Sequence, residues 1–299
     1  MKFPLPILLL APIVLITLPL STLTAREYWR HNEYQGDIGA CHIFATVALI
    51  EAEYWRSTGQ FIDLSERDLF LRHYSNGARS SSEIIADQLI AATQKKLPQN
   101  FNEAGNVDRD FDLAKKYGIA SERELPYDSY FSTDIAMAVR SLRHNRDQLS
   151  LEANQLKRTK QWSSSVAQHK IQQSHGQLSR VNKALALPHS TVTRGWTQKW
   201  LTGYQIKRVK PKTSSQAKSL IISRLAHRPV AVDLSNSTEI ASNSQRFSTS
   251  YTRHSLVVSH YNPTTDQFTI RNSTRKGSTK VSADILSRGT YKLYYLEKK

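Results

Sequence analysis

The chain has 299 residues, of which 39% are hydrophobic and 22% are charged, and its formal net charge is +16. This composition excludes a disordered or fibrous protein, and the length is sufficient to bury a core in one large domain or two modest ones. A single cysteine, Cys41, excludes an internal disulfide.

The first 25 residues have the composition of a secretory signal. Met1 and Lys2 give a positive start, residues 3–20 form an apolar run, and small residues lead to Ala25, after which a signal peptidase could cut. A transmembrane anchor is the alternative, but four prolines in this segment disfavour a stable membrane helix. We therefore expect a signal peptide at residues 1–25 and a secreted or periplasmic protein, not a cytoplasmic one.

Helical patterns dominate the next part of the chain. Apolar residues at three- and four-residue spacing predict a helix from Cys41 to about residue 55. Ser65, followed three residues later by Asp68, predicts the capped start of a second helix. Residues 107–117, closed by Gly118, predict a third.

Residues 131–212 differ from their flanks because they are strongly basic. They hold fifteen lysines and arginines against three carboxylates, and their middle is rich in Gln, Ser and Leu. We expect polar helices that form an insertion. Two interpretations stay open: a solvated helical face, or a site for an anionic partner such as nucleic acid, lipopolysaccharide or an acidic protein.

From residue 219 onward the pattern is typical of strands. We expect them at residues 228–234, 254–259, 267–270 and 290–295. Helices first and strands later predict an α+β fold with two lobes.

Cys41 lies at the start of a predicted helix, where the helix dipole lowers the pKa of a thiol and a nearby imidazole can hold the thiolate. Gln35 lies six positions earlier, and Gly36 and Gly39 allow the chain to fold its side-chain amide back over the thiol. That amide could stabilise the oxyanion of an acyl-transfer reaction. The alternative for Cys41 is a small, buried apolar residue.

Several short motifs, in the same order along the chain, resemble those of papain-like cysteine peptidases. Residues 35–45 resemble the Q-G-x-C-G-x-C-W-A-F segment around the nucleophile of that family, and residues 64–69 resemble L-S-E-Q-x-L. Residues 116–127 resemble Y-G-I…Y-P-Y, and residues 228–232 resemble Q-P-V-x-V. Residues 253–258 are similar to D-H-A-V-x-x, and residues 270–273 to I-K-N-S-W.

The resemblance implies a papain-like two-lobed fold in one peptidase domain at residues 26–299. A helical lobe would span residues 26–130, the basic insertion residues 131–212 and a β-rich lobe residues 213–299, with the active cleft between the lobes. By resemblance, Cys41 attacks the scissile carbonyl, His254 transfers protons, Asn272 orients His254, and Gln35 helps form the oxyanion hole.

The resemblance also assigns substrate contacts. Gly105 and Asn106 correspond to paired glycines that meet the substrate backbone, although only one glycine remains here. Arg253, beside His254, stands where the family has an acid or asparagine and is expected to influence substrate preference. His42 and His260 are rival imidazoles, more typical of polar packing or of the surface, and Asn272 has the alternative role of a turn residue.

Other departures from the family pattern alter the expectations. The disulfide cysteines of the family are absent, with Ile38 in the place of one, so the core must hold without them. Thr274 replaces the tryptophan that shields the His–Asn hydrogen bond, so we expect this bond to be more hydrated. If the signal ends at Ala25, the segment before Cys41 is too short for the usual inhibitory propeptide.

These observations predict a secreted cysteine peptidase that hydrolyses peptide bonds through an acyl-enzyme on Cys41. We expect no cofactor and no metal, a protein or peptide substrate, and a monomer. A catalytically inactive papain-like binding protein is one alternative, and a related acyl transferase or amidase is another.

Overall fold

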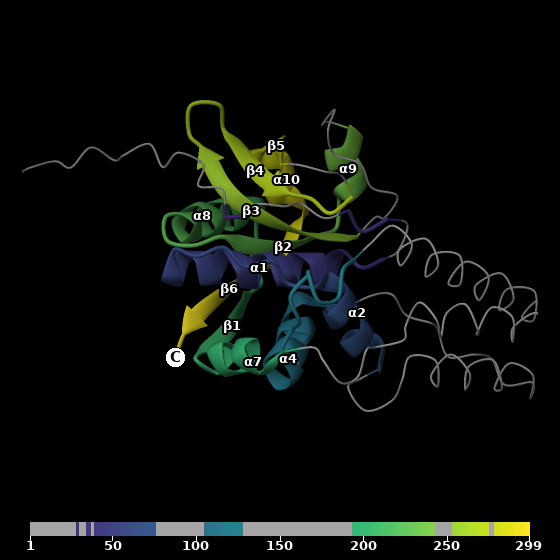
Figure 1. The fold of residues 1–299 in the computed structure, drawn as a ribbon. Coiled ribbons are helices and arrows are strands. Elements are labelled where there is room, and N and C mark those ends of the chain that lie inside the picture. Colours follow the sequence, from purple (N-terminus) through teal and green to yellow (C-terminus); the bar gives the residue numbers. More distant parts are fainter. Residues whose placement is uncertain are drawn as a thin grey trace, which may run out of the picture.

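The computed structural model describes residues 28–29, 34–36, 39–75, 105–127, 193–242, 253–274 and 278–299. Helices and strands combine there in an α+β fold, as the sequence predicts (Figure 1). The expected signal peptide and the part of the basic insertion up to residue 192 lie outside the described residues. Within the described ranges, no helix has both the length and the apolar character needed to span a membrane.

The three helices predicted in the first half of the chain are confirmed, and they form the helical lobe. These are α1 (Cys41–Thr58), α2 (Glu66–Ser75) and α4 (Val107–Tyr117). Ser65 caps α2, because its Oγ accepts a hydrogen bond from the N–H of Asp68 at 3.0 Å. The carboxylate of Asp68 binds elsewhere: it accepts from the N–H of Ala120 at 2.8 Å and from Arg194 at 2.7 Å.

A six-stranded antiparallel sheet forms the second lobe, in the order β1-β6-β2-β3-β4-β5. Its strands are β1 (Tyr204–Val209), β2 (Val230–Leu234), β3 (His254–Asn262), β4 (Gln267–Arg271), β5 (Ser278–Ser282) and β6 (Thr290–Lys298). The four predicted strands are confirmed as β2, β3, β4 and β6. The C-terminal strand β6 lies between β1 and β2, so the end of the chain completes the sheet.

Three further helices flank the sheet: α8 (Ser214–Leu225), α9 (Ser237–Ser242) and α10 (Ala283–Gly289). Helix α8 corrects the expectation that the chain is strand-like from residue 219 onward. Thr213 caps this helix by accepting from the N–H of Gln216 at 3.1 Å. Only Ala217 and Ile221 are buried in it, and this narrow apolar stripe of two residues gives a weak helical pattern.

The end of the basic segment belongs to the fold rather than to an insertion. Helix α7 (Gly195–Thr202) packs against α4, and β1 pairs with β6 along its whole length. Arg194 also binds both carboxylate oxygens of Asp68 on α2, at 2.7 and 2.9 Å. The boundary that we expected at residue 213 is therefore not a boundary in the structure.

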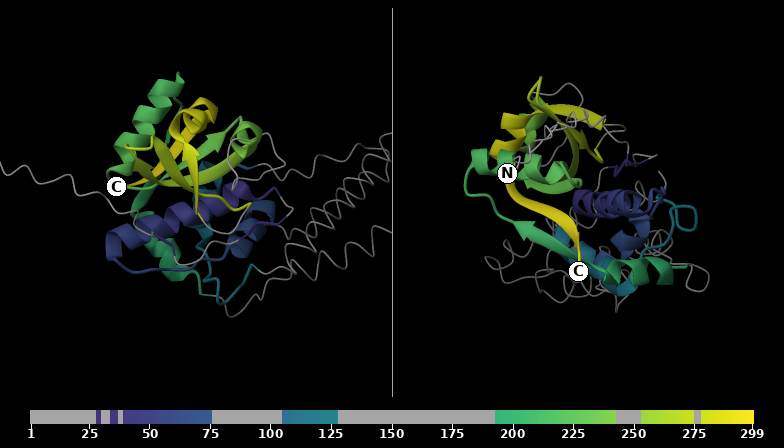
Figure 2. Two further views of the ribbon diagram at one scale, coloured as in Figure 1. Left: turned by 90° about the horizontal axis from the view of Figure 1, so that it is seen from above. Right: turned by 90° about the vertical axis from the view of Figure 1, so that its left-hand side faces the viewer.

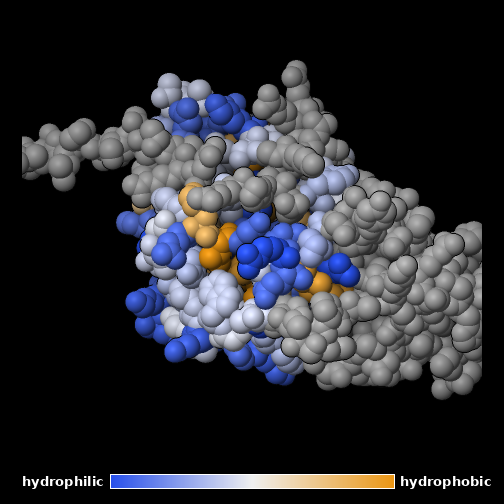
Figure 3. Space-filling view, viewed as in Figure 1, coloured by the Kyte–Doolittle hydropathy of each residue, from blue (hydrophilic) through white to orange (hydrophobic). Residues whose placement is uncertain are grey.

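Helix α1 lies between the other helices of its lobe and the sheet (Figures 1 and 2). One apolar core joins α1, α2 and α4 to the near face of the sheet, and a second lies between the opposite face and α8 and α10. Because side chains alternate between the two faces of a strand, β2 contributes to both cores: Ala231 belongs to the first core, and Val230 and Val232 belong to the second. Most of the described surface seen in Figure 3 is hydrophilic, with a small apolar area near its middle.

A buried ion pair links α1 to the end of β4. Oε2 of Glu51 lies 3.0 Å from Nη1 of Arg271, and both side chains are almost fully buried. The second oxygen of Glu51 accepts from the N–H of Leu64 at 2.9 Å. Burial raises the pKa of Glu51 to about 7, although the charge of Arg271 opposes that rise. The pair therefore fixes the strand end that precedes Asn272 to the central helix.

Replacing Arg271 with methionine is expected to lower the free energy of unfolding by about 3–5 kcal/mol, because Glu51 then stays buried without its cation. Denaturant unfolding at pH 8 measures this loss. The matched control is Arg288→Met, which removes an exposed ion pair with Glu239 and should cost at most about 1 kcal/mol. Equal stability of the two variants would contradict the role of the Glu51–Arg271 pair.

Candidate active site

Cys41 is the first residue of α1, and part of its surface is accessible. The backbone N–H of Ser255, on strand β3, donates a hydrogen bond to its Sγ at 3.4 Å. Because α1 packs against β3, this contact joins the two lobes at the N-terminal end of the helix. The helix start predicted at Cys41 is thus confirmed, and His254 is the neighbour of the residue that contacts the thiol.

His254, the first residue of β3, forms a short hydrogen bond with Asn272, which follows β4. Nε2 of the imidazole lies 2.6 Å from Oδ1 of Asn272, and both side chains are buried. Nδ2 of Asn272 donates to Oγ1 of Thr274 at 2.7 Å, which turns Oδ1 toward the imidazole. Nε2 therefore carries the proton of the neutral ring, and Nδ1 is its basic nitrogen.

Thr274 corrects one expectation from the sequence. We expected the His254–Asn272 bond to be more hydrated without a shielding tryptophan, yet Asn272 has no exposed surface and His254 is only 2% exposed. The threonine hydroxyl instead orients the asparagine amide through the hydrogen bond described above. In the sequence, Thr274 marks only the absence of the shielding tryptophan. A motif shows which residue is absent but not what the replacing side chain contacts.

Gln35 is anchored by three hydrogen bonds. Its N–H donates to the carbonyl of Ser273 at 2.8 Å, and its own carbonyl accepts from the Tyr127 hydroxyl at 2.8 Å. The hydroxyl of Ser273 donates to Oε1 of Gln35 at 2.5 Å, so the NH2 group lies at the other end of the amide. Gly36 follows with a φ of 68°, a left-handed conformation that glycine adopts without cost. Gln35 is thus bound by Ser273, the residue that directly follows Asn272.

The three residues expected to meet substrate occupy different environments. Gly105 lies against the ring of His42, where a Cβ atom would collide. Asn106 precedes α4, and its Oδ1 accepts from Nζ of Lys292 on β6 at 3.0 Å. Arg253 is exposed beside His254. Lys292 reaches the helical lobe from the sheet, a link between distant segments that no local motif predicts.

Burial controls the charge state of the candidate pair. It raises the pKa of the Cys41 thiol, although the charge of His42 and the N–H of Ser255 oppose this. It also lowers the pKa of His254 to about 4, against the effects of Asn272 and Asp233. The sequence predicts a thiolate at the helix start, whereas burial of the thiol acts in the opposite direction. Burial therefore favours the uncharged form of both groups.

A second buried cluster lies beside the thiol in the helical lobe. Nδ1 of His42 is 2.5 Å from Oδ2 of Asp110, and Nδ1 of His73 is 2.6 Å from Oδ1 of the same carboxylate. The rings are 4.7 Å apart. Burial of His42 excludes the surface alternative and agrees with polar packing. Asp110 lies on the apolar stripe of its helix, with Val107, Phe111 and Ala114, and this position was the sequence signal for a buried carboxylate.

Among the described residues, these three side chains form the one group of His, Cys, Asp and Glu that could hold a metal ion. Neighbouring ligand atoms of a tetrahedral zinc site are about 3.3 Å apart, as its bond lengths of about 2.0–2.1 Å require. The two Nδ1–O distances of 2.5 and 2.6 Å are well below this separation and correspond to short hydrogen bonds. We therefore interpret the cluster as a carboxylate that accepts from two imidazoles.

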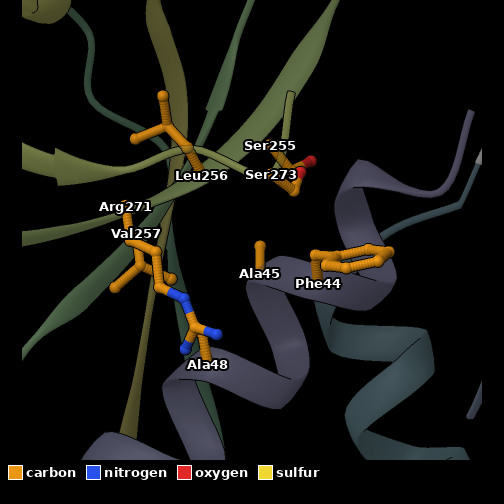
Figure 4. A pocket seen from close by; sticks show the side chains of 8 residues that line it. All are labelled: Phe44, Ala45, Ala48, Ser255, Leu256, Val257, Arg271 and Ser273. Atoms are coloured by element: carbon orange, nitrogen blue, oxygen red, sulfur yellow. The ribbon is translucent and has the colours of Figure 1, made fainter. Parts of the chain in front are cut away.

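A small cavity of about 10 Å³ lies between α1 and the strands β3 and β4 (Figure 4). Phe44, Ala45 and Ala48 line it from the helix side, and Ser255, Arg271 and Ser273 line it from the sheet side. This volume is close to that needed by one water molecule and is too small for a substrate side chain. The cavity is thus part of the contact between the lobes.

No family model matches the chain, and no curated protein sequence matches it. PepW from Lactobacillus rhamnosis HN001 matches with a TM-score of 0.55 and 14% identity, covering 89% of this chain and 79% of PepW. The Carica candamarcensis cysteine protease CMS1MS2, solved with E-64, gives a TM-score of 0.49 and 14% identity over 91% of this chain and 94% of that protein.

A structure from a study of the mite allergens Blo t 1 and Der p 1 gives a TM-score of 0.47 and 15% identity, over 90% of this chain and 67% of that one. At these identities the likeness is one of fold. With the helical lobe, the antiparallel sheet and the PepW match together, the papain-like fold expected from the motifs is confirmed.

Asp110→Ala is expected to lower the free energy of unfolding by about 2–4 kcal/mol, because two buried imidazoles lose their acceptor. Thermal unfolding of the wild type with and without EDTA should give the same melting temperature. A rise in melting temperature with added Zn²⁺ that Asp110→Ala abolishes would contradict the hydrogen-bond interpretation and identify a metal site.

The low pKa of His254 predicts that stability falls on acidification. The folded state binds fewer protons than the unfolded state between pH 4 and the ordinary histidine pKa of about 6.5, so the free energy of unfolding decreases as the pH falls through this window. The contribution is about 3 kcal/mol in total. Denaturant unfolding from pH 4.5 to 7.5 should give a smaller slope for His254→Gln, whereas the exposed control His227→Gln should keep the wild-type slope.

Proposed function

We propose that this chain, which has the papain-like fold, is a cysteine-type peptidase that hydrolyses peptide bonds. The observation that carries the proposal is the buried His254–Asn272 hydrogen bond, at 2.6 Å, next to the residue whose N–H contacts Cys41 Sγ. A nucleophile, a base and a group that orients the base are the parts that such a reaction needs.

The neutral charge states determine how the proton moves. His254 is a base at neutral pH, and its Nδ1 can take the thiol proton as Sγ of Cys41 bonds to the scissile carbonyl carbon. The imidazolium that forms is stabilised by Asn272 at Nε2. It then gives its proton to the leaving amine as the C–N bond breaks, which leaves an acyl-enzyme. Water hydrolyses this thioester in a second step with His254 again as base, which restores the thiol.

Two donors support the oxyanion in this proposal. The N–H of Cys41 at the start of α1 is one, because the first N–H groups of a helix have no partner within the helix. The NH2 group of Gln35 is the other, and the Ser273 hydroxyl bond to Oε1 favours this orientation. Removing one oxyanion donor in other enzymes lowers kcat by about 10²–10³-fold.

The proposed substrate is an extended peptide or protein. Gly105 and Asn106 would meet its backbone, and Arg253 would meet a side chain near the scissile bond. We also propose that the protein is exported, on the composition of residues 1–25. The anionic partner of the basic segment and the monomeric state stay predictions.

The test is hydrolysis of a peptide library by the purified chain, with products identified by mass spectrometry. Cys41→Ala and His254→Ala should lower the rate by about 10³-fold or more. Asn272→Ala should lower it less, because the base remains but loses its orientation. The matched control is His260→Gln, a histidine on the same strand β3, which should leave the rate unchanged.

The rival functions give different results in the same assay. Transfer of the acyl group to added hydroxylamine in preference to water would identify an acyl transferase. A folded wild-type protein that cleaves no peptide, and whose thiol does not react with an epoxysuccinyl inhibitor, would overturn the proposal in favour of a catalytically inactive binding protein.

A further inference from the structure

Asp233 is a buried carboxylate that the reaction described above does not use. It lies on β2 between the apolar residues Val232 and Leu234, and it is only 3% exposed. Alternation along β2 places it on the same face as Ala231, which belongs to the core around α1. A charged group is rarely buried at such a position unless its partners satisfy it.

The partners of Asp233 come from the two neighbouring strands. The Ser255 hydroxyl on β3 donates to its Oδ1 at 2.7 Å, and the Tyr294 hydroxyl on β6 donates to its Oδ2 at 2.8 Å. Nζ of Lys292 lies 3.6 Å from Oδ2. The sheet register explains these contacts, because Ser255 and Lys292 lie directly opposite Asp233 on β3 and β6.

Ser255 connects this carboxylate to the thiol. Its hydroxyl binds Asp233, and its backbone N–H donates to Sγ of Cys41. His254 precedes Ser255 directly, so all four groups lie within one part of the contact between β2, β3 and α1. We propose that Asp233 is a positioning residue: its carboxylate fixes Ser255 against the thiol, and its negative charge sets the pH range in which the Cys41–His254 pair reacts.

The directions of the pKa shifts agree with this geometry. The charge of Asp233 raises the pKa of Cys41 and also raises that of His254. Both ionisations of the pair therefore move toward higher pH in its presence. A purely structural carboxylate would affect the amount of folded protein and the reaction rate, but not the pH at which the pair ionises.

The other charges near this site are accounted for. Around the pair and Asp233, α1 contributes His42, and Arg253 directly precedes β3. Strand β6 contributes Lys292 and the phenols of Tyr291 and Tyr294, and α4 contributes Asp108. Helices α8 and α10 also pack on β2, but their charged side chains bind other groups. Lys218 contacts Asp266 and Asp284, Arg224 lies over Tyr295, and Arg288 binds Glu239.

Asp233→Asn tests this proposal most directly, because it removes the negative charge and keeps the size and shape of the side chain. The asparagine oxygen can accept from Ser255, and its NH2 group can donate to the Tyr294 hydroxyl. The readout is the rate of Cys41 alkylation by iodoacetamide from pH 3.5 to 10, followed by intact mass. Since Cys41 is the only cysteine, an adduct that is absent from Cys41→Ala reports this thiol. We expect the inflections of the pH profile to move about 0.5–1 pH unit to lower pH.

The matched control is Tyr294→Phe, which removes one hydrogen bond to Asp233 but leaves its charge. Its inflections should stay at the wild-type pH. The proposal is overturned if folded Asp233→Asn has wild-type inflections, or if Tyr294→Phe moves them equally, since the cause would then be packing.

A second variant keeps the test decisive if Asp233→Asn does not fold. Lys292→Met removes the cation that offsets Asp233, so the inflections should move to higher pH; no movement would count against the proposal. The inference rests on the proposed Cys–His pair but not on peptide hydrolysis. If the inflections of Asp233→Asn move but the wild type cleaves no peptide, the role of Asp233 is kept and the peptidase is rejected. If the wild type cleaves peptides but the inflections do not move, the peptidase is kept and the role of Asp233 is rejected.

Discussion

Helix α1 packs against strand β3, and every part of the candidate site depends on this contact. The helix brings Cys41 to the N–H of Ser255 at one end and, ten residues later, Glu51 to Arg271. Strand β3 supplies His254, and the segment after β4 supplies Asn272. A shift of α1 along the sheet would separate the thiol from the imidazole while leaving both lobes intact. The apolar core that includes Val257 and Tyr294 opposes such a shift by burial of apolar surface.

Burial is also the dominant electrostatic effect in this protein. It favours a neutral thiol and a neutral imidazole, and it raises the pKa of Glu51. Three buried carboxylates have specific partners: Asp110 has two imidazoles, Asp233 has two hydroxyls and Lys292, and Asp68 has Arg194. An unpaired charge in such a core would cost several kcal/mol, so these polar contacts restrict how the lobes can pack.

The chain has no disulfide, and polar contacts instead link segments that are distant in the sequence. Arg194 ties the region before α7 to α2, Arg271 ties β4 to α1, and Lys292 reaches Asn106 from β6. A disulfide would stabilise mainly by restricting the unfolded chain. Buried ion pairs act differently, because their strength depends on geometry in the folded state.

Local pattern was sufficient to predict the α+β class, the three helices of the first lobe and four strands. These depend on periodicity, on the Ser65 cap and on glycines, which act within a few residues. The weak amphipathic stripe of α8 and the short helices α9 and α10 were not apparent, and β1 was taken for part of the insertion. Strand β1 is defined by its pairing with β6, about ninety residues later, which no window of neighbouring residues contains.

The sequence by itself determined which residue types stand at the motif positions: Gln35, Cys41, His254 and Asn272. Only the tertiary structure decided how they interact. It turned the Asn272 oxygen toward His254 through Thr274 and engaged the Gln35 oxygen with Ser273. It also brought Asp233 and His42 of the Asp110 cluster close enough to the thiol to change its pKa. The reason is physical: hydrogen-bond direction and desolvation depend on groups that are far apart in the chain and become neighbours only when α1 packs on the sheet.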